Sequence, residues 1–236
     1  MNTDLILCAA IVCKKQEYAL EQVIKKLDKH KFNNKYILFD GPPLASLTQQ
    51  KGVYERYTKY KNHIKINYPD FKYIENTDCI YYRKTIETFI RDNFDGLAKN
   101  LLIVQDDVLL DDFDLEKVLE IKADFSECKI LYFREHRLRC KHWFNTIDDS
   151  GVLIKTHGWS ERAYLITKEH ILEILDNLPH KGGKKGKFIE YYYQNMLQYK
   201  ARWENLTEEE QLEYWKKWGC YEHPDIRHIH LATKRS

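Results

Sequence analysis

The chain has 236 residues, of which 43% are hydrophobic and 14% aromatic, so it can build one large folded core and is not a disordered chain. A formal net charge of +2 gives no argument for nucleic acid or a membrane surface as a partner. The longest N-terminal apolar run, residues 5–13, is too short to span a bilayer and follows no basic stretch, so we expect neither a transmembrane segment nor a secretory signal. The six cysteines lack CxxC spacing, which favours reduced thiols and a cytoplasmic protein.

The first half of the chain alternates strand-like and helix-like segments. Short apolar runs bounded by turn residues mark the strands, and apolar positions that recur every three or four residues mark the helices. We predict strands at 5–12, 36–39, 71–75 and 101–104, and helices at 17–30, within 44–67 and at 81–94. This order predicts an α/β fold with a mostly parallel central sheet, flanked by helices and joined by right-handed crossovers.

The second half is less regular. Asp114 is expected to cap a helix at 115–121, followed by a strand at 129–133, a helix around 171–175 and an aromatic-rich helix at 188–199. The basic loop HKGGKKGK (180–187) is either a solvated charge run, a lid over a diphosphate or a nucleic-acid contact. The tryptophan-rich segment 201–219 either packs on the core or binds a glycan or a second subunit.

Two adjacent carboxylates follow the most apolar predicted strand. Asp106 and Asp107 come directly after residues 101–104, and in a parallel sheet ligands bind at the carboxyl ends of the strands. Lys14, Asp40 and Asp78 follow the other strands and would converge on the same edge. Paired carboxylates suit Mg²⁺ or Mn²⁺, and the alternative is a polar loop with two solvated aspartates. The glycine motifs of dinucleotide-binding folds and P-loops are absent from the sequence.

Two motifs carry a resemblance to a known family. QDDV (105–108) resembles the D-x-D or E-D-D metal motif of nucleotide-sugar glycosyltransferases with the GT-A fold. HGWSERAYLIT (157–167) resembles the G-x-x-A-Y-L-I-S stretch that lies downstream in the collagen- and lipopolysaccharide-type members of this family. Gln105 stands where a strict D-x-D has its first carboxylate. The resemblance implies one GT-A-like domain over 1–236, with a nucleotide-binding half at 1–110 and an acceptor half at 111–236.

The resemblance also implies a metal site for Mn²⁺ or Mg²⁺. Asp107 would bind the metal, while Asp106 would contact the ribose or the sugar. Members of the family often complete the metal shell with a histidine near the C-terminus, and His228 and His230 are the candidates, with His228 preferred. Alternation along an extended segment would put both on one face. The alternative is that both are ordinary surface or interface histidines.

Further residues are candidates for the donor site. Asp40 resembles the family's acid that contacts the base or the ribose, although an Asp-Gly-Pro-Pro turn needs no ligand to explain it. Asp78 has the same interpretation, or it caps the next helix. Trp159 could stack on a sugar, and Arg162 could hold phosphate or form a surface ion pair with Glu161. The last candidate, at the end of the first strand, is Val12.

An inverting reaction would need a carboxylate near the acceptor hydroxyl, and either Glu161 or Glu190 would be that base. Otherwise Glu161 pairs with its neighbour and Glu190 is a first-turn helix acid. We therefore predict a metal-dependent glycosyltransferase that moves a sugar, with UDP as the nucleotide implied by the resemblance, to a hydroxyl of a glycan, protein or small molecule. The alternatives are a non-catalytic module that binds glycan or nucleic acid, and another metal-dependent nucleotidyl or phosphoryl transferase. No stable nucleic-acid complex is expected, and a homodimer stays open.

Overall fold

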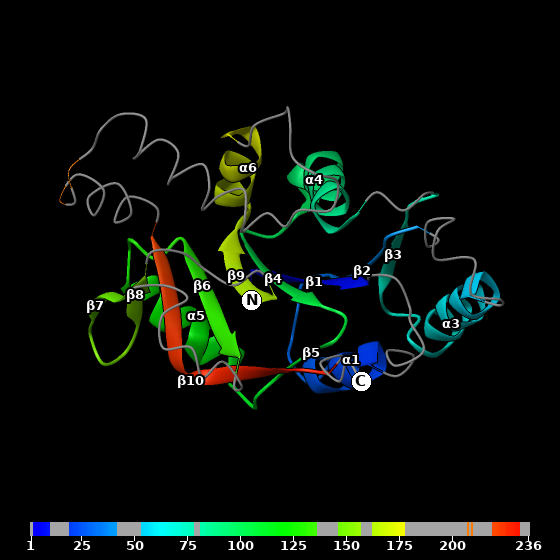
Figure 1. Cartoon of the computed structure of the whole chain (residues 1–236), viewed down its shortest axis with the longest axis horizontal. Helices are drawn as coiled ribbons and strands as arrows, with labels where there is room; N and C mark the ends of the chain where they lie inside the picture. The colour runs from blue at the N-terminus through cyan, green and yellow to red at the C-terminus, as the bar shows by residue number, and fades with distance from the viewer. Residues whose placement is uncertain are drawn as a thin grey trace.

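The computed structural model of the chain describes residues 2–9, 19–41, 53–77, 81–135, 146–156, 162–177, 207, 209 and 219–231. Its first half alternates strands and helices in the predicted order (Figure 1). These elements are β1 (Thr3–Ala9), α1 (Ala19–Leu27), β2 (Lys35–Phe39), α3 (Val53–Asn67), β3 (Lys72–Glu75), α4 (Tyr81–Asn93), the 3₁₀ turn η1 (Phe94–Gly96) and β4 (Asn100–Gln105).

The second half contains more short strands. Its elements are β5 (Val108–Leu110), α5 (Leu115–Asp124), β6 (Ile130–Glu135), β7 (Thr146–Asp149), β8 (Ile154–Thr156), β9 (Ala163–Thr167), α6 (Lys168–Asn177) and β10 (Cys220–His230). The sequence pattern predicts α5, β6, α6 and the extended end of β10, but it gives no separate signal for β5, β7, β8 or β9. Each of these four strands has three to five residues, too few for an alternating pattern to stand out.

Ten strands of the described part form one sheet in the order β3-β2-β1-β4-β9-β6-β10-β8-β7, with β5 attached to β10. The first four strands pair in parallel, which confirms the predicted parallel sheet in this half. In the other half β9 runs antiparallel between β4 and β6, while β10 runs parallel to β6. The predicted α/β class, with a central sheet flanked by helices, is confirmed.

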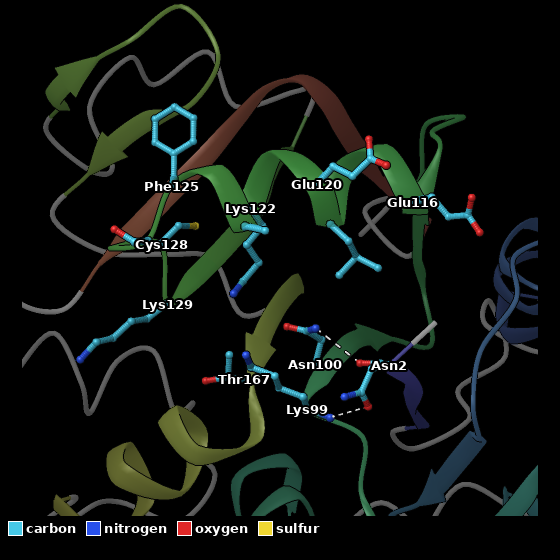
Figure 2. Close-up of a pocket in the computed structure, with 13 residues that line it drawn as sticks. Asn2, Lys99, Asn100, Glu116, Glu120, Lys122, Phe125, Cys128, Lys129 and Thr167 are labelled. Carbon is cyan, nitrogen blue, oxygen red and sulfur yellow. Dashed lines mark hydrogen bonds between the residues drawn. The ribbon is translucent and has the colours of Figure 1, made fainter.

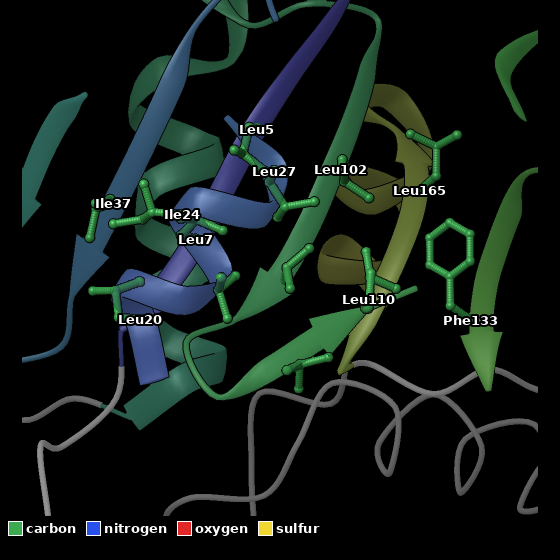
Figure 3. Close-up of a cluster of buried hydrophobic side chains, with 14 of the residues drawn as sticks. Leu5, Leu7, Leu20, Ile24, Leu27, Ile37, Leu102, Leu110, Phe133 and Leu165 are labelled. Atoms are coloured by element: carbon green, nitrogen blue, oxygen red, sulfur yellow. The ribbon is translucent and has the colours of Figure 1, made fainter. Parts of the chain in front are cut away.

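Helices cover both faces of the sheet. The core on one face gathers residues of α1, α3 and α5, and the core on the other face gathers residues of α4 and α6. Leu5 and Leu7 of β1 face the first core, where Leu20 and Ile24 of α1 pack, and Ile6 faces the second (Figure 3). All five side chains are at most 1% exposed, and burying one such side chain stabilises the fold by about 1.5–3 kcal/mol.

A buried acid anchors the amino end of β1. The Asp4 side chain is fully buried, and its Oδ1 accepts hydrogen bonds of 2.9 Å from both the backbone N–H and the Nδ2 of Asn34. Its Oδ2 accepts a third bond, 2.8 Å long, from the N–H of Ala98. Because donors from two loops satisfy this carboxylate, it ties β1 to the connections before β2 and β4.

The sequence also predicts reduced cysteines and no transmembrane segment. Cys8, Cys128 and Cys220 are buried and form no disulfide within the described residues. Burial raises the pKa of the Cys128 thiol to about 12, so this cysteine stays protonated and unreactive at neutral pH. In the ranges that the structure describes, every helix is too short or too polar to cross a bilayer.

Candidate functional site

The carboxyl ends of β1, β2 and β4 meet at one edge of the sheet, which we call the carboxyl edge. The backbone N–H of Asp40 donates to the carbonyl of Ala9 at 3.1 Å, and the N–H of Asp106 donates to the carbonyl of Cys8 at 3.1 Å. Asp40 and Asp106 therefore flank the end of β1 on its two sides. Two strand spacings separate their backbones, which is about 10 Å. This confirms the predicted convergence for these two aspartates.

The two adjacent acids occupy the turn between β4 and β5. Asp106 is 6% exposed and Asp107 is 5% exposed, so they are not solvated loop residues. Burying two neighbouring carboxylates is costly unless a cation or hydrogen-bond donors compensate their charge. The burial contradicts the alternative of a polar loop with two solvated aspartates, and the site roles of both acids stay predictions.

The end of β10 lies beside this turn. The N–H of Leu231 donates to the carbonyl of Asp107 at 2.7 Å, and the antiparallel pairing of β10 with β5 places His230 opposite Val108. His228 pairs with Leu110, three residues beyond the turn and thus about 10 Å farther along the strand. The pairing brings the backbone of His230, rather than that of the preferred His228, next to Asp107. The side chain of His230 lies outside the described residues.

His228 has a defined ring orientation of its own. It is fully buried, and its Nδ1 lies 2.7 Å from the carbonyl oxygen of Phe133 on β6. A carbonyl only accepts hydrogen bonds, so Nδ1 carries the proton and Nε2 of the neutral ring keeps its lone pair. Proteins hold many metal-binding histidines by such a bond, but the same bond also suits a structural histidine between two strands.

Hydrogen bonds from other parts of the chain hold both the carboxylate and the backbone carbonyl of Asp40. Thr85 Oγ1 of α4 donates to Asp40 Oδ1 at 3.2 Å, and Thr85 in turn accepts from Asn76 Nδ2 at 2.9 Å. The hydroxyl of Tyr57 on α3 donates to the Asp40 carbonyl at 3.4 Å. The Asp40 side chain is thus a buried acid that accepts a hydrogen bond from α4, so its interactions reach beyond the turn that it begins.

A basic residue stands at the same edge. The carbonyl of Arg162 accepts from the N–H of Gln105 at 2.9 Å, so Arg162 lies where β9 begins, beside the end of β4. The stretch that resembles the family's second motif therefore pairs with the strand that carries the first motif. The arrangement places the backbone of Arg162 next to the residue that precedes the acid pair, and its predicted role in phosphate binding stays a prediction.

Tyr60 is a neighbour of the site that sequence reasoning missed. It is 8% exposed, and burial followed by the negative charges of Asp106 and Glu21 raises its pKa well above the usual value, so the phenol stays protonated. The α3 segment looked poorly patterned because it is rich in lysine. The signal was the spacing of Tyr57, Tyr60 and Ile64, which are all buried on one face.

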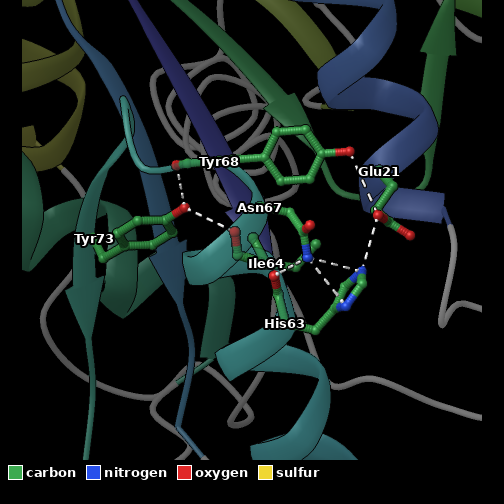
Figure 4. Close-up of polar contacts among 6 residues, drawn as sticks. All are labelled: Glu21, His63, Ile64, Asn67, Tyr68 and Tyr73. Atoms are coloured by element: carbon green, nitrogen blue, oxygen red, sulfur yellow. Dashed lines mark hydrogen bonds and ion pairs between the residues drawn. The ribbon is translucent and has the colours of Figure 1, made fainter.

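A polar network holds α3 against α1 near this tyrosine (Figure 4). Glu21 Oε1 lies 3.1 Å from His63 Nε2 and accepts a 3.4 Å bond from the hydroxyl of Tyr68. The hydroxyl of Tyr73 donates to the carbonyls of Tyr68 at 2.6 Å and Ile64 at 3.2 Å. The end of α3 is therefore bound both to α1 and to β3, which fixes the helix that carries Tyr60.

Several predicted site residues lie outside the described residues, and their roles stay predictions. They are Val12, Asp78, Trp159, Glu161, Glu190 and the side chain of His230, together with Lys14, the loop 180–187 and most of the tryptophan-rich segment. Within the described residues no group of three or more His, Cys, Asp or Glu side chains is placed to hold a metal ion. The metal role predicted for Asp107 therefore stays a prediction, and further ligands would have to come from side chains beyond the described part.

Solved structures of glycosyltransferases share the fold of this chain. It aligns over 98% of its length with 58% of a mannosyltransferase, PcManGT from Pyrobaculum calidifontis in complex with GDP-Man and Mn²⁺, at 11% identity and a TM-score of 0.60. It also aligns over 97% of its length with 43% of GalNAc-T7 with UDP, GalNAc and Mn²⁺, at 10% identity and a TM-score of 0.57. A TarS fragment from S. aureus in complex with UDP-GlcNAc aligns at 11% identity and a TM-score of 0.52, over 62% of that chain.

Sequence comparisons alone do not reach this result. No protein-family model matches the sequence, and no curated protein sequence does either. The chain spans about half of the length of the solved structures that it matches, between 43% and 62% of the three described above. At 10–11% identity the likeness shows the fold, which is the GT-A fold of nucleotide-sugar glycosyltransferases that the sequence motifs predict.

Proposed function

We propose that the chain is a glycosyltransferase that moves a sugar from a nucleotide-sugar donor to an acceptor hydroxyl. One observation carries the proposal: the carboxyl edge of a GT-A fold gathers three buried acids, Asp40, Asp106 and Asp107, beside Arg162. Ligands of open α/β sheets bind at this edge. Fold alone does not determine function, so the proposal depends on these side chains.

Each residue has a proposed role in donor binding. Asp40 would bind the base or the ribose, Asp106 the ribose or the sugar, and Arg162 a phosphate. The protonated hydroxyl of Tyr60 would be a further hydrogen-bond donor close to Asp106. Outside the described residues, Val12 and Asp78 would contact the donor, and Trp159 would stack on the sugar.

The reaction would break the bond between the anomeric carbon and the donor phosphate and form a bond from that carbon to the acceptor oxygen. The nucleotide leaves with the electron pair, and the acceptor proton passes to a base, for which Glu161 and Glu190 are the alternatives if the reaction inverts. A divalent metal, when bound, would stabilise the charge that grows on the leaving phosphate. Asp107 would hold this metal, with a histidine from the end of β10.

The nucleotide is not decided by the comparisons, because the similar structures hold both GDP-linked and UDP-linked ligands. We propose UDP, as the sequence motifs imply. The first test is thermal unfolding with UDP, GDP and ATP, each with and without Mn²⁺. A ligand at one hundred times its Kd stabilises a protein by about 2.7 kcal/mol, which for this size is a rise in Tm of about 5 to 10 °C.

We expect UDP to raise the Tm of the chain only when Mn²⁺ is present. Stabilisation by ATP and not by UDP would favour a nucleotidyl or phosphoryl transferase instead. A Tm that responds to no nucleotide, with or without metal, would contradict the proposed function and favour a non-catalytic binding module. Hydrolysis of a panel of UDP-sugars then identifies the donor sugar.

A further inference from the structure

A second site lies at the opposite edge of the sheet, which we call the amino edge because β4 begins there. A cavity of about 670 Å³ opens between α5 and the start of β4 (Figure 2). Asn2, Lys99 and Asn100 line one wall, Lys122 of α5 lines the other, and Thr167 stands at the end of β9 between them. Five residue steps of β4 separate this cavity from Gln105, about 17 Å, so it is not part of the proposed donor site.

Lys122 is the unusual residue of this cavity. The residue is only 8% exposed, and its side chain forms no hydrogen bond or ion pair within the described part of the chain. The burial is that of its aliphatic stem, since the ammonium group itself reaches the open cavity. Lys155 is equally buried, but its ammonium pairs with Glu127. Lys122 therefore presents to the cavity an ammonium group that no described residue pairs.

A second ammonium group faces the first. In Figure 2 the side chains of Lys122 and Lys99 extend into the cavity from opposite walls and converge above Thr167. Burial, and to a smaller extent the charge of Lys99, lowers the pKa of Lys122, which agrees with two close positive groups. The hydroxyl of Thr167 accepts from the N–H of His170 at 3.3 Å and keeps its own hydrogen for donation.

The other charged residues around the cavity do not neutralise this pair. Glu116 and Glu120 are exposed, and Figure 2 shows their carboxylates directed away from the amino group of Lys122. Lys129 extends to the outer side, where its ammonium lies 4.0 Å from the carboxylate of Glu173. The cavity interior thus carries a net positive charge from two lysines, with an apolar wall from Leu119 and Ala123.

We propose that this cavity binds a small organic phosphate. The phosphate group would accept hydrogen bonds from the ammonium groups of Lys122 and Lys99 and from the hydroxyl of Thr167, and its two negative charges would match the two lysines. The volume lies in the range of pockets that hold small-molecule ligands, so an organic part fits beside Leu119 and Ala123. Ligand binding would give the ammonium group of Lys122 the partner that no described residue supplies.

The test is calorimetric titration of the whole chain, in EDTA to keep divalent metals from the carboxyl edge. The probes are phenyl phosphate and inorganic phosphate, and the variants are Lys122→Met and Lys99→Met. The control is Lys117→Met, which changes an exposed lysine of the same helix that does not line the cavity. We expect phenyl phosphate to bind more tightly than inorganic phosphate. In either cavity variant its Kd should rise by about tenfold or more, because a charge-assisted hydrogen bond is lost.

The control variant should bind phenyl phosphate like the original chain. The proposal would be overturned by no binding to the original chain, by an equal loss in the control variant, or by unchanged binding in both cavity variants. Inorganic phosphate that binds as tightly as phenyl phosphate would also overturn it, because the apolar wall would then contribute nothing. If Lys122→Met does not fold, Lys99→Met decides, since Lys99 is exposed and its loss does not disturb a core.

Discussion

The two edges of this sheet carry charges of opposite sign. At the carboxyl edge, Asp40, Asp106 and Asp107 are buried at the ends of strands. At the amino edge, the buried acid Asp4 accepts three hydrogen bonds from the chain itself, while the ammonium group of Lys122 opens to a cavity. The ligands that we propose differ accordingly, with a metal-dependent sugar donor at the carboxyl edge and a phosphate at the amino edge.

Strand β10 connects the two edges. It begins beside the amino edge, where the carbonyl of Gly219 accepts from the N–H groups of Lys129 and Ile130, both at 3.0 Å. It ends beside the carboxyl edge at His230, and the N–H of the next residue, Leu231, donates to the carbonyl of Asp107. Substitutions at the carboxyl edge, at the amino edge and in β10 should therefore have different effects on activity and stability.

The largest effect is expected at the acid pair. Asp107→Asn removes the charge of the proposed metal ligand, so we expect metal-dependent donor hydrolysis to fall by about 100- to 1000-fold, the scale of losing one electrostatic stabiliser of a transition state. The control is Asp112→Asn, in the same region of the chain, where an exposed carboxylate pairs with Lys26 and Lys29. Equal activity of the two variants would remove Asp107 from the metal site.

The next effect concerns the anchor of β10. Gly219 has φ +57°, and a Cβ there would lie 1.9 Å from the carbonyl oxygen of Glu127. Gly219→Ala adds this backbone clash to the cost of left-handed geometry, so we expect a loss of about 3 kcal/mol or more in the free energy of unfolding, measured in urea. Gly151→Ala is the control: φ is +75° but the space is open, so only about 1 kcal/mol should be lost. Equal losses would show that the clash relaxes.

A pH effect is expected next to the lysine cavity. Burial lowers the pKa of His170 to about 4, against the opposing hydrogen bond of Glu173, with Lys129 and Lys122 adding to the decrease. Between about pH 6.5 and pH 4 the unfolded chain binds a proton here that the folded chain does not, so stability is lost as the pH falls through this window. We expect this histidine to account for about 2 to 3 kcal/mol of the loss.

The measurement is urea unfolding of the original chain and His170→Gln at pH 7, 5.5 and 4.5. The variant should show a flatter dependence of unfolding free energy on pH, because other groups titrate alike in both chains. Parallel profiles for the two chains would mean that His170 does not titrate abnormally.

The smallest effect concerns the start of the helix that carries Lys122. Asp114 caps α5, and its Oδ1 accepts from the N–H groups of Glu116 at 3.0 Å and Lys117 at 3.3 Å. Asp114→Ala should cost about 1 kcal/mol, whereas Glu120→Ala, an exposed change on the same helix, should cost less than about 0.5 kcal/mol. If both variants unfold at the same urea concentration, the cap does not contribute to stability.

Local patterns predicted the first half of the fold well. The run Leu101–Val104 is apolar on both faces and became the central strand β4, and the cap at Asp114 formed as expected. The short strands β5 and β9 were not predicted, because three to five residues in a mixed sheet leave no periodic signal. The end of α4 was predicted within a residue, because its apolar residues recur at helical spacing.

Sequence alone determined the fold class and the acid pair, because buried strands, turn residues and adjacent carboxylates are local features of the chain. Only the tertiary structure decided which distant residues meet those acids: β10 returns beside β5 and brings the backbone of His230, not that of His228, to Asp107. It also decided that Lys99 and Lys122 face one cavity. Such pairings depend on strand order and register across the whole sheet, which no short stretch of sequence encodes.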